Sequence, residues 1–304
     1  MATFGRLITA MVTPFNENGD VDYAQAVRLA KGLIDSGSDS LVVSGTTGES
    51  PTLSTREKLT LFSEIKAALG NRGQVIAGTG NYNTAESIDL SREAEHAGVD
   101  GLLLVVPYYN KPPQEGLYQH FKAIAGSTRL PCIVYNVPSR TVTNMSADTV
   151  IRLSAIENIV GVKEASGNFD QVGEIIAKTP RGFLVYSGND NDTLALLALG
   201  GYGVISVASH LVGGRIRDMI NQFTSGDTEG AAAIHHELAP LVKSLFLTAN
   251  PIPLKGALNL TGFNVGRPRL PLIELDEKQS AAMAQLLTRY QLDGYLQRQV
   301  AAVS

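Results

Sequence analysis

The stretch 74–106, QVIAGTGNYNTAESIDLSREAEHAGVDGLLLVV, decides the fold. It holds two apolar runs, Gln74–Ala77 and Gly101–Val106, with a helical pattern over Thr84–Ala97 between them, ended by Gly98. The apolar runs are continuous and do not alternate with polar residues, which is typical of strands buried on both faces of a parallel sheet. The stretch therefore predicts one strand–helix–strand unit with parallel strands.

The same unit repeats along most of the chain. Further apolar runs are candidate strands at Leu7–Val12, Ser40–Val43, Cys132–Asn136, Ile159–Lys163, Phe183–Ser187 and Gly203–Val207. Helical patterns lie between such runs or after the last at Tyr23–Ser36, Thr55–Leu69, Ser146–Leu153, Asp190–Leu199 and Gly214–Phe223. Repeated strand–helix pairs with parallel connections predict an α/β fold, a closed (β/α)8 TIM barrel. A doubly wound open sheet is the alternative, but it would need a glycine-rich turn after the first strand, where the chain has Thr13-Pro14-Phe15.

The alternation stops near residue 225. Beyond it the sequence shows helical patterns at Thr228–Leu247, Leu254–Leu260 and Asp276–Val300. We therefore predict a catalytic barrel over residues 1–225 and a small C-terminal helical domain over residues 226–304.

Composition narrows the function classes. The chain has 304 residues, and its 25 Lys and Arg are scattered against 29 Asp and Glu, so nucleic-acid binding is disfavoured. The single cysteine, Cys132, cannot form an internal disulfide, which favours a reducing compartment. The N-terminus lacks the pattern of a signal peptide, and the longest apolar run, Leu102–Pro107, is far shorter than the roughly 18 residues of a membrane helix. We expect a cytoplasmic protein that does not bind a membrane.

Active sites of such barrels lie at the carboxyl ends of the strands, so the residues at the ends of the runs are candidates. Lys163 ends the sixth run. Burial lowers the pKa of a lysine, and a neutral amine can form a Schiff base with a ketone. Tyr135, in the fifth run, could then transfer protons. The structural alternatives are an ion pair between Lys163 and Glu164 or another carboxylate, and a tyrosine that only fills the core.

Three further segments follow strand ends. The loop Gly45–Glu49 carries the adjacent hydroxyls of Thr46 and Thr47, which suit a carboxylate or a proton chain, or else form a tight turn that caps the next helix. Arg140 suits bidentate recognition of a carboxylate, or else is a solvated surface residue. The pair Tyr108-Tyr109 indicates a subunit contact or a pocket wall.

No metal or cofactor is expected. His235-His236-Glu237 lacks the spacing of a zinc-binding helix. Gly78 and Gly80 have no third glycine, so they do not form a dinucleotide fingerprint.

Taken together, the motifs resemble those of the dihydrodipicolinate synthase family, in order and over essentially the whole chain. They are Gly45–Ser50, Pro107–Tyr109, Tyr135–Thr141, Val162–Gly167 and Asn250–Lys255. The wider group of pyruvate-dependent class I aldolases, which includes N-acetylneuraminate lyase, shares the lysine and the tyrosine. The Thr46-Thr47 pair and Arg140 favour the synthases, because the lyase resembles a Ser-Thr version without that arginine.

The resemblance implies a lyase that condenses pyruvate with L-aspartate 4-semialdehyde, the first committed step towards diaminopimelate and lysine. Lys163 would form the imine with pyruvate. The proton relay would consist of Tyr135, Thr46 and Tyr109, the last reaching in from a neighbouring subunit of a homotetramer built from tight dimers. The two alternatives are a related aldolase or lyase acting on a sugar-derived 2-keto acid, and a catalytically silent barrel that binds a small molecule.

The resemblance also implies which residues bind the substrates. Thr47 and the backbone around Ile205 would hold the pyruvate carboxylate, Gly188 would line the site, and Arg140 would receive the carboxylate of the semialdehyde.

Feedback-inhibited relatives bind lysine at the dimer interface, and the resemblance gives an expectation there as well. The positions that match are Ser50, Glu86 and Tyr108, whereas those that depart are Pro51, Thr55, Lys58 and Tyr82. Lys58 places a like charge near the ammonium of the effector, and like charges repel in a partly desolvated cleft. We expect weak or no inhibition by L-lysine.

Overall fold

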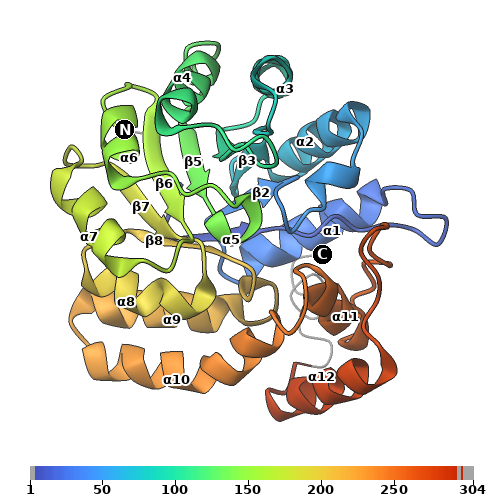
Figure 1. The fold of residues 1–304 in the computed structure, drawn as a ribbon. Coiled ribbons are helices and arrows are strands. Elements are labelled where there is room, and N and C mark those ends of the chain that lie inside the picture. The colour runs from blue at the N-terminus through green and yellow to red at the C-terminus, as the bar shows by residue number, and fades with distance from the viewer. Residues whose placement is uncertain (1–3, 293–295, 297–304) are drawn as a thin grey trace.

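A computed structural model describes residues 4–292 and 296 of the chain (Figure 1). Eight parallel strands form a closed barrel in chain order, with β1 hydrogen-bonded to both β2 and β8. The strands are β1 (Leu7–Ala10), β2 (Ser40–Val43), β3 (Gln74–Gly78), β4 (Gly101–Val105), β5 (Cys132–Asn136), β6 (Ile159–Glu164), β7 (Leu184–Ser187) and β8 (Gly203–Ser206). The predicted TIM barrel is confirmed, and the open-sheet alternative is wrong.

Helices surround the barrel, and most of them lie where the apolar periodicity placed them (Figure 1). They are α1 (Tyr23–Asp35), α2 (Thr55–Leu69), α3 (Thr84–His96), α4 (Gln114–Ala125), α5 (Pro138–Thr141), α6 (Ala147–Leu153), α7 (Phe169–Lys178), α8 (Thr193–Ala198) and α9 (Ser209–Ser225), with short 3-10 helices η1 (Ser50–Thr52) and η2 (Asp190–Asp192). The start of α2 illustrates how the local sequence fixes the beginning of a helix. Ser54 and Glu57 form a capping box that satisfies exposed backbone N–H groups.

Two predicted helices have different limits in the structure. The helix expected over Asp190–Leu199 starts as η2, because the Asp190 carboxylate is held by the Ser206 hydroxyl and by the backbone N–H groups of Val207 and Ala208. The helix expected over Gly214–Phe223 is only the later part of α9, which starts at Ser209 and is broken by a non-helical Val212. Helices α4, α5 and α7 were not predicted from the sequence.

The core has two layers, and the barrel encloses the inner one. Inward-facing side chains such as Ile8, Val42, Ile133 and Ile205 fill the barrel, and Tyr135 lies in this inner layer. The outer layer lies between the strands and the helices. This arrangement follows from the alternation of side chains along each strand, with both faces covered.

Among the described residues, the helices that follow the barrel are α10 (Thr228–Ser244), α11 (Ile252–Leu260) and α12 (Glu277–Arg289). Figure 1 shows α10 lying along α9 and α11 lying beside α12, all on the same side of the molecule. Their buried residues belong to the same apolar cluster as the outer barrel layer, so a domain boundary at residue 225 stays a prediction. The helix predicted over Asp276–Val300 runs partly beyond the described residues. Within residues 4–292 and 296, no helix is both long and apolar enough to cross a membrane.

Candidate active site

A small cavity of about 130 Å³ opens at the carboxyl ends of the strands. It brings together residues that the sequence analysis singled out from four different strand ends: Thr46, Thr47, Tyr135, Arg140, Lys163 and Gly188. The remaining lining comes from apolar residues of β1, β2 and β4, from further residues of the loops that follow the strands, and from Phe246 and Asn250 in the C-terminal part of the chain. The cavity is therefore the candidate active site.

Lys163 projects from β6 into this cavity and is buried, with 5% of its surface exposed. Its Nζ lies 4.3 Å from the centroid of the Tyr135 ring. Burial lowers the pKa of Lys163 to about 8; Asp190 opposes this lowering and Arg140 adds to it. A lysine with this pKa is about one-tenth neutral at pH 7, which makes it a usable nucleophile.

Glu164, the neighbour of Lys163, faces the outer layer because successive side chains of a strand point to opposite sides. Its carboxylate accepts hydrogen bonds from Asn136 Nδ2, Gln171 Nε2 and the backbone N–H of Ser166. The alternative in which Glu164 pairs with Lys163 is therefore wrong. Within the described part of the chain, Lys163 forms no ion pair at all.

Tyr135 and Thr46 form the second feature of the site. Tyr135 is buried, and it lines the cavity together with Thr46, whose side chain interacts with the phenol. Burial raises the pKa of Tyr135 to about 12, although Arg140 and the side chain of Thr46 lower it. The phenol is therefore protonated near neutral pH and can pass a proton on while Thr46 re-supplies it.

Arg140 and Thr47 both form hydrogen bonds with Asn250, a residue for which the sequence predicted no role. Asn250 donates from its side-chain Nδ2 to Thr47 Oγ1 at 2.9 Å. The backbone carbonyl of Asn250 accepts from the Arg140 guanidinium at 3.3 Å. Its buried Oδ1 accepts no hydrogen bond within the described residues, and the side chain lines the cavity. The motif Asn250–Lys255 contained a sequence signal for this role of Asn250. The asparagine precedes two prolines, and its side-chain amide needs a polar partner when it is buried.

Of the remaining predicted site residues, Gly188 lines the cavity, whereas the side chains of Ile205 and Tyr109 do not. At Gly188 an added Cβ would lie 2.6 Å from Ala165 Cβ and 3.2 Å from Lys163 Cε, so glycine leaves the room that the lysine needs. The Ile205 side chain is buried inside the barrel and does not line the cavity. Tyr109 is 91% exposed with a positive φ of 69°, and it does not reach the cavity of its own chain.

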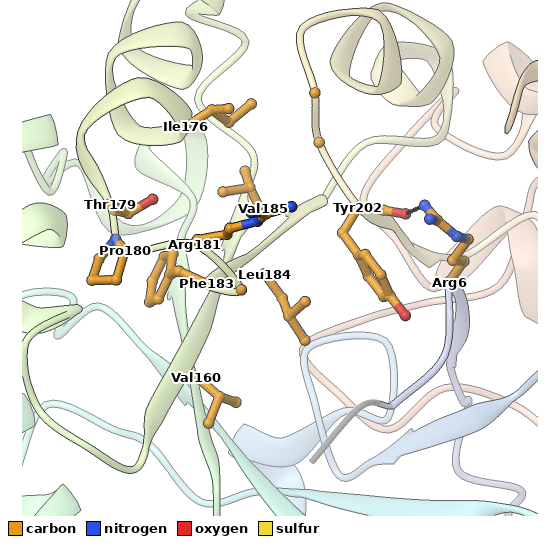
Figure 2. Close-up of a pocket in the computed structure, with 13 residues that line it drawn as sticks. Arg6, Val160, Ile176, Thr179, Pro180, Arg181, Phe183, Leu184, Val185 and Tyr202 are labelled. Atoms are coloured by element: carbon orange, nitrogen blue, oxygen red, sulfur yellow. Dashed lines mark hydrogen bonds between the residues drawn. The ribbon is translucent and has the colours of Figure 1, made fainter. Parts of the chain in front are cut away.

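Larger cavities lie elsewhere, among them one of about 350 Å³ between α11 and the segment that leads into α12. One of about 360 Å³ adjoins the site, sharing Thr46, Tyr135 and Arg140 with it and adding Lys58 and Tyr82. Another of about 490 Å³ lies at the amino ends of β1, β7 and β8, where Arg6 donates to the carbonyl of Tyr202 (Figure 2). That cavity holds no predicted site residue, so size does not identify the site here. Among the described residues, no three His, Cys, Asp or Glu side chains gather to hold a metal.

A buried lysine against a phenol–threonine pair, at the carboxyl ends of a closed parallel barrel, defines the class as a lyase of the class I aldolase type. The family model described as "Dihydrodipicolinate synthetase family" matches residues 3–290. The chain belongs to this family. The enzyme class and the family expected from the sequence are confirmed.

Individual relatives agree with this. A 4-hydroxy-tetrahydrodipicolinate synthase of Dehalococcoides mccartyi is 62% identical over 96% of this chain and 99% of its own length. The crystal structure of a dihydrodipicolinate synthase from Bacillus anthracis has a TM-score of 0.92 at 48% identity and covers 95% of this chain and 99% of that one. A lysine-bound dihydrodipicolinate synthase from Cyanidioschyzon merolae has a TM-score of 0.94 at 47% identity, with the same coverage. The function predicted from the sequence, 4-hydroxy-tetrahydrodipicolinate synthesis in the lysine and diaminopimelate route, is confirmed by such relatives.

Proposed function

We propose that Lys163 forms the imine with pyruvate, and that the resulting enamine attacks L-aspartate 4-semialdehyde within the cavity at the carboxyl ends of the strands. The observation that carries this proposal is the burial of Lys163 against the Tyr135 ring, without a carboxylate in an ion pair. Such a lysine is neutral often enough to attack a ketone.

In the first half of the reaction, Lys163 Nζ attacks the ketone carbon of pyruvate, and the ketone oxygen leaves as water. That oxygen must gain two protons, one of which comes from the amine itself. Tyr135, which lines the cavity beside Thr46, is placed to carry them. Thr47 and the backbone near Ile205 hold the carboxylate of pyruvate, and Asn250 orients the Thr47 hydroxyl by donating to it.

In the second half, loss of a methyl proton from the imine gives the enamine. Its terminal carbon forms the new C–C bond with the aldehyde carbon of the semialdehyde, whose oxygen takes up a proton. Arg140 receives the carboxylate of the semialdehyde. The unpartnered Asn250 Oδ1 offers an acceptor for the substrate amino group. That amine then attacks the imine carbon, which closes the ring and releases Lys163.

Borohydride trapping with pyruvate, followed by peptide mass mapping, tests the proposal. The chain offers an internal control, because burial also lowers the pKa of Lys255 to about 8. We expect the reduced adduct on the Lys163 peptide, and its loss in Lys163→Ala. An adduct on Lys255 instead, or none at all, would contradict the assignment. A related aldolase for sugar-derived 2-keto acids would form the same adduct but would not consume L-aspartate 4-semialdehyde.

The proposal extends to assembly and location. Tyr109 is exposed in the single chain, which supports a role in the relay of a neighbouring subunit within a homotetramer of tight dimers. A cytoplasmic location fits an enzyme of amino-acid biosynthesis. Sedimentation analysis of the purified chain tests the tetramer.

A further inference from the structure

We propose that Glu49 and Lys255 are positioning residues whose buried ion pair holds the Thr46-Thr47 loop in its catalytic geometry. The C-terminal helices are then part of the catalytic machinery rather than a cover for the barrel. The inference rests on the roles proposed above for Thr46 and Thr47.

The pair is almost completely enclosed. Lys255 Nζ lies 2.7 Å from Glu49 Oε1, and the two side chains are 1% and 0% exposed. The second carboxylate oxygen of Glu49 accepts from the backbone N–H of Arg269 at 2.8 Å. Lys255 Nζ also donates to the carbonyl of Arg267 at 3.2 Å. The end of the Glu49 side chain is therefore held by α11 and by the segment that follows it.

The backbone at Glu49 passes this constraint to the catalytic loop. Glu49 has a positive φ of 56°, a conformation that a residue with a side chain adopts only when its surroundings hold it there. Its N–H donates to the carbonyl of Thr46 at 3.0 Å, and the N–H of Ser50 donates to the carbonyl of Gly45 at 3.2 Å. Moving Glu49 would therefore move Thr46, which lines the cavity together with Tyr135.

The ion pair also has aromatic and charged neighbours. The Phe15 ring contacts both cations, with Lys255 Nζ 4.1 Å and the Arg269 guanidinium carbon 4.4 Å from its centroid. Arg269 in turn forms an ion pair with Glu57 on α2. Buried ion pairs contribute little net stability but can fix a unique arrangement, and here the fixed element is the loop of the site.

The test uses Glu49→Gln, Lys255→Met and the double variant, which removes both charges together. Lys66→Met serves as the control, because it breaks a half-buried ion pair with Asp100 that contacts β3 and not the site. For each variant, thermal melting gives the folded fraction, and stopped-flow borohydride trapping gives the rate of imine formation per folded chain. The wild-type enzyme, measured alongside, reports on the proposed function independently.

We expect both single variants to melt earlier, because each leaves one buried charge unpaired. The double variant should recover stability while imine formation per folded chain stays roughly ten- to a hundredfold slower than in the wild type, since misplacing a catalytic group by about 1 Å costs this much. Lys66→Met should melt earlier with an unchanged rate. A folded double variant with the wild-type rate, or an equal loss of rate in Lys66→Met, would overturn the inference, while trapping in the wild type would still support Lys163 as nucleophile.

Discussion

Replacing Lys163 by methionine should abolish imine formation and at the same time stabilise the folded protein. Methionine has a similar length and no charge, so it can fill the space between Tyr135 and Gly188 without desolvating an ammonium group. The catalytic lysine is, on this reasoning, a source of instability that the rest of the fold offsets.

The size of the effect follows from the pKa of Lys163, which burial lowers from 10.5 to about 8. A lysine whose pKa is lower in the folded state destabilises the protein fully below the folded pKa, and the penalty disappears as the pH rises to the unfolded value. The penalty is therefore about 3 kcal/mol at pH 7 and about 1.4 kcal/mol at pH 9.5. The buried Asp190 loses a nearby cation in the variant, so these figures are upper values.

Urea unfolding of the wild type and of Lys163→Met at pH 7 and pH 9.5 measures the difference in free energy. Lys255→Met is the matched control: its lysine has a similar pKa, but its removal strands the Glu49 carboxylate, so this variant should be less stable than the wild type. A Lys163→Met protein that is less stable than the wild type at pH 7, or whose gain grows with pH, would refute the reasoning.

The remaining predictions concern substrate binding, assembly and regulation. Arg140→Ala should raise KM for the semialdehyde by roughly tenfold, about 1.5 kcal/mol for an exposed charge-assisted contact, and should affect pyruvate less; steady-state kinetics that show equal effects would assign Arg140 to holding the loop. Mixing Tyr109→Phe chains with Lys163→Ala chains should restore part of the activity after subunit exchange, and a mixture that stays inactive despite proven exchange excludes a shared site. L-lysine should inhibit weakly, because the partly buried ammonium of Lys58 lies in the cavity beside the site and interacts with Glu86; half-inhibition below about 1 mM in a steady-state titration would contradict this.

The barrel could be predicted from the sequence because each strand is a short apolar run that needs no long-range information to recognise. Lys163 stood out for the same reason, as a charge at the end of such a run. The helices α4 and α7 carry buried residues at helical spacing, Leu117 and Phe121 in one and Val172 and Ile175 in the other. They were missed although the periodic signal was present.

Other features depend on tertiary contacts that no local pattern contains. The turn at η2 follows from hydrogen bonds between Asp190 and the end of β8, which override the helical pattern of the segment. The part played by Asn250 depends on Thr47, from which it is separated by 203 positions in the chain. The alternative that paired Lys163 with Glu164 could not be excluded from the sequence, because the partners that hold Glu164 come from β5 and α7.

The contact between Asn250 and Thr47 also has a consequence for the order of events during synthesis on the ribosome. The loop after β2 is among the first parts of the site to be made, whereas the side chain that holds Thr47 emerges long after β8 has been completed. Domains form progressively as the nascent chain lengthens, so the barrel can close before its catalytic loop is fixed. We expect a ribosome-bound chain that ends after α9 to have a closed barrel and no activity. Activity should appear only during synthesis of about the last fifth of the chain, which contains Asn250.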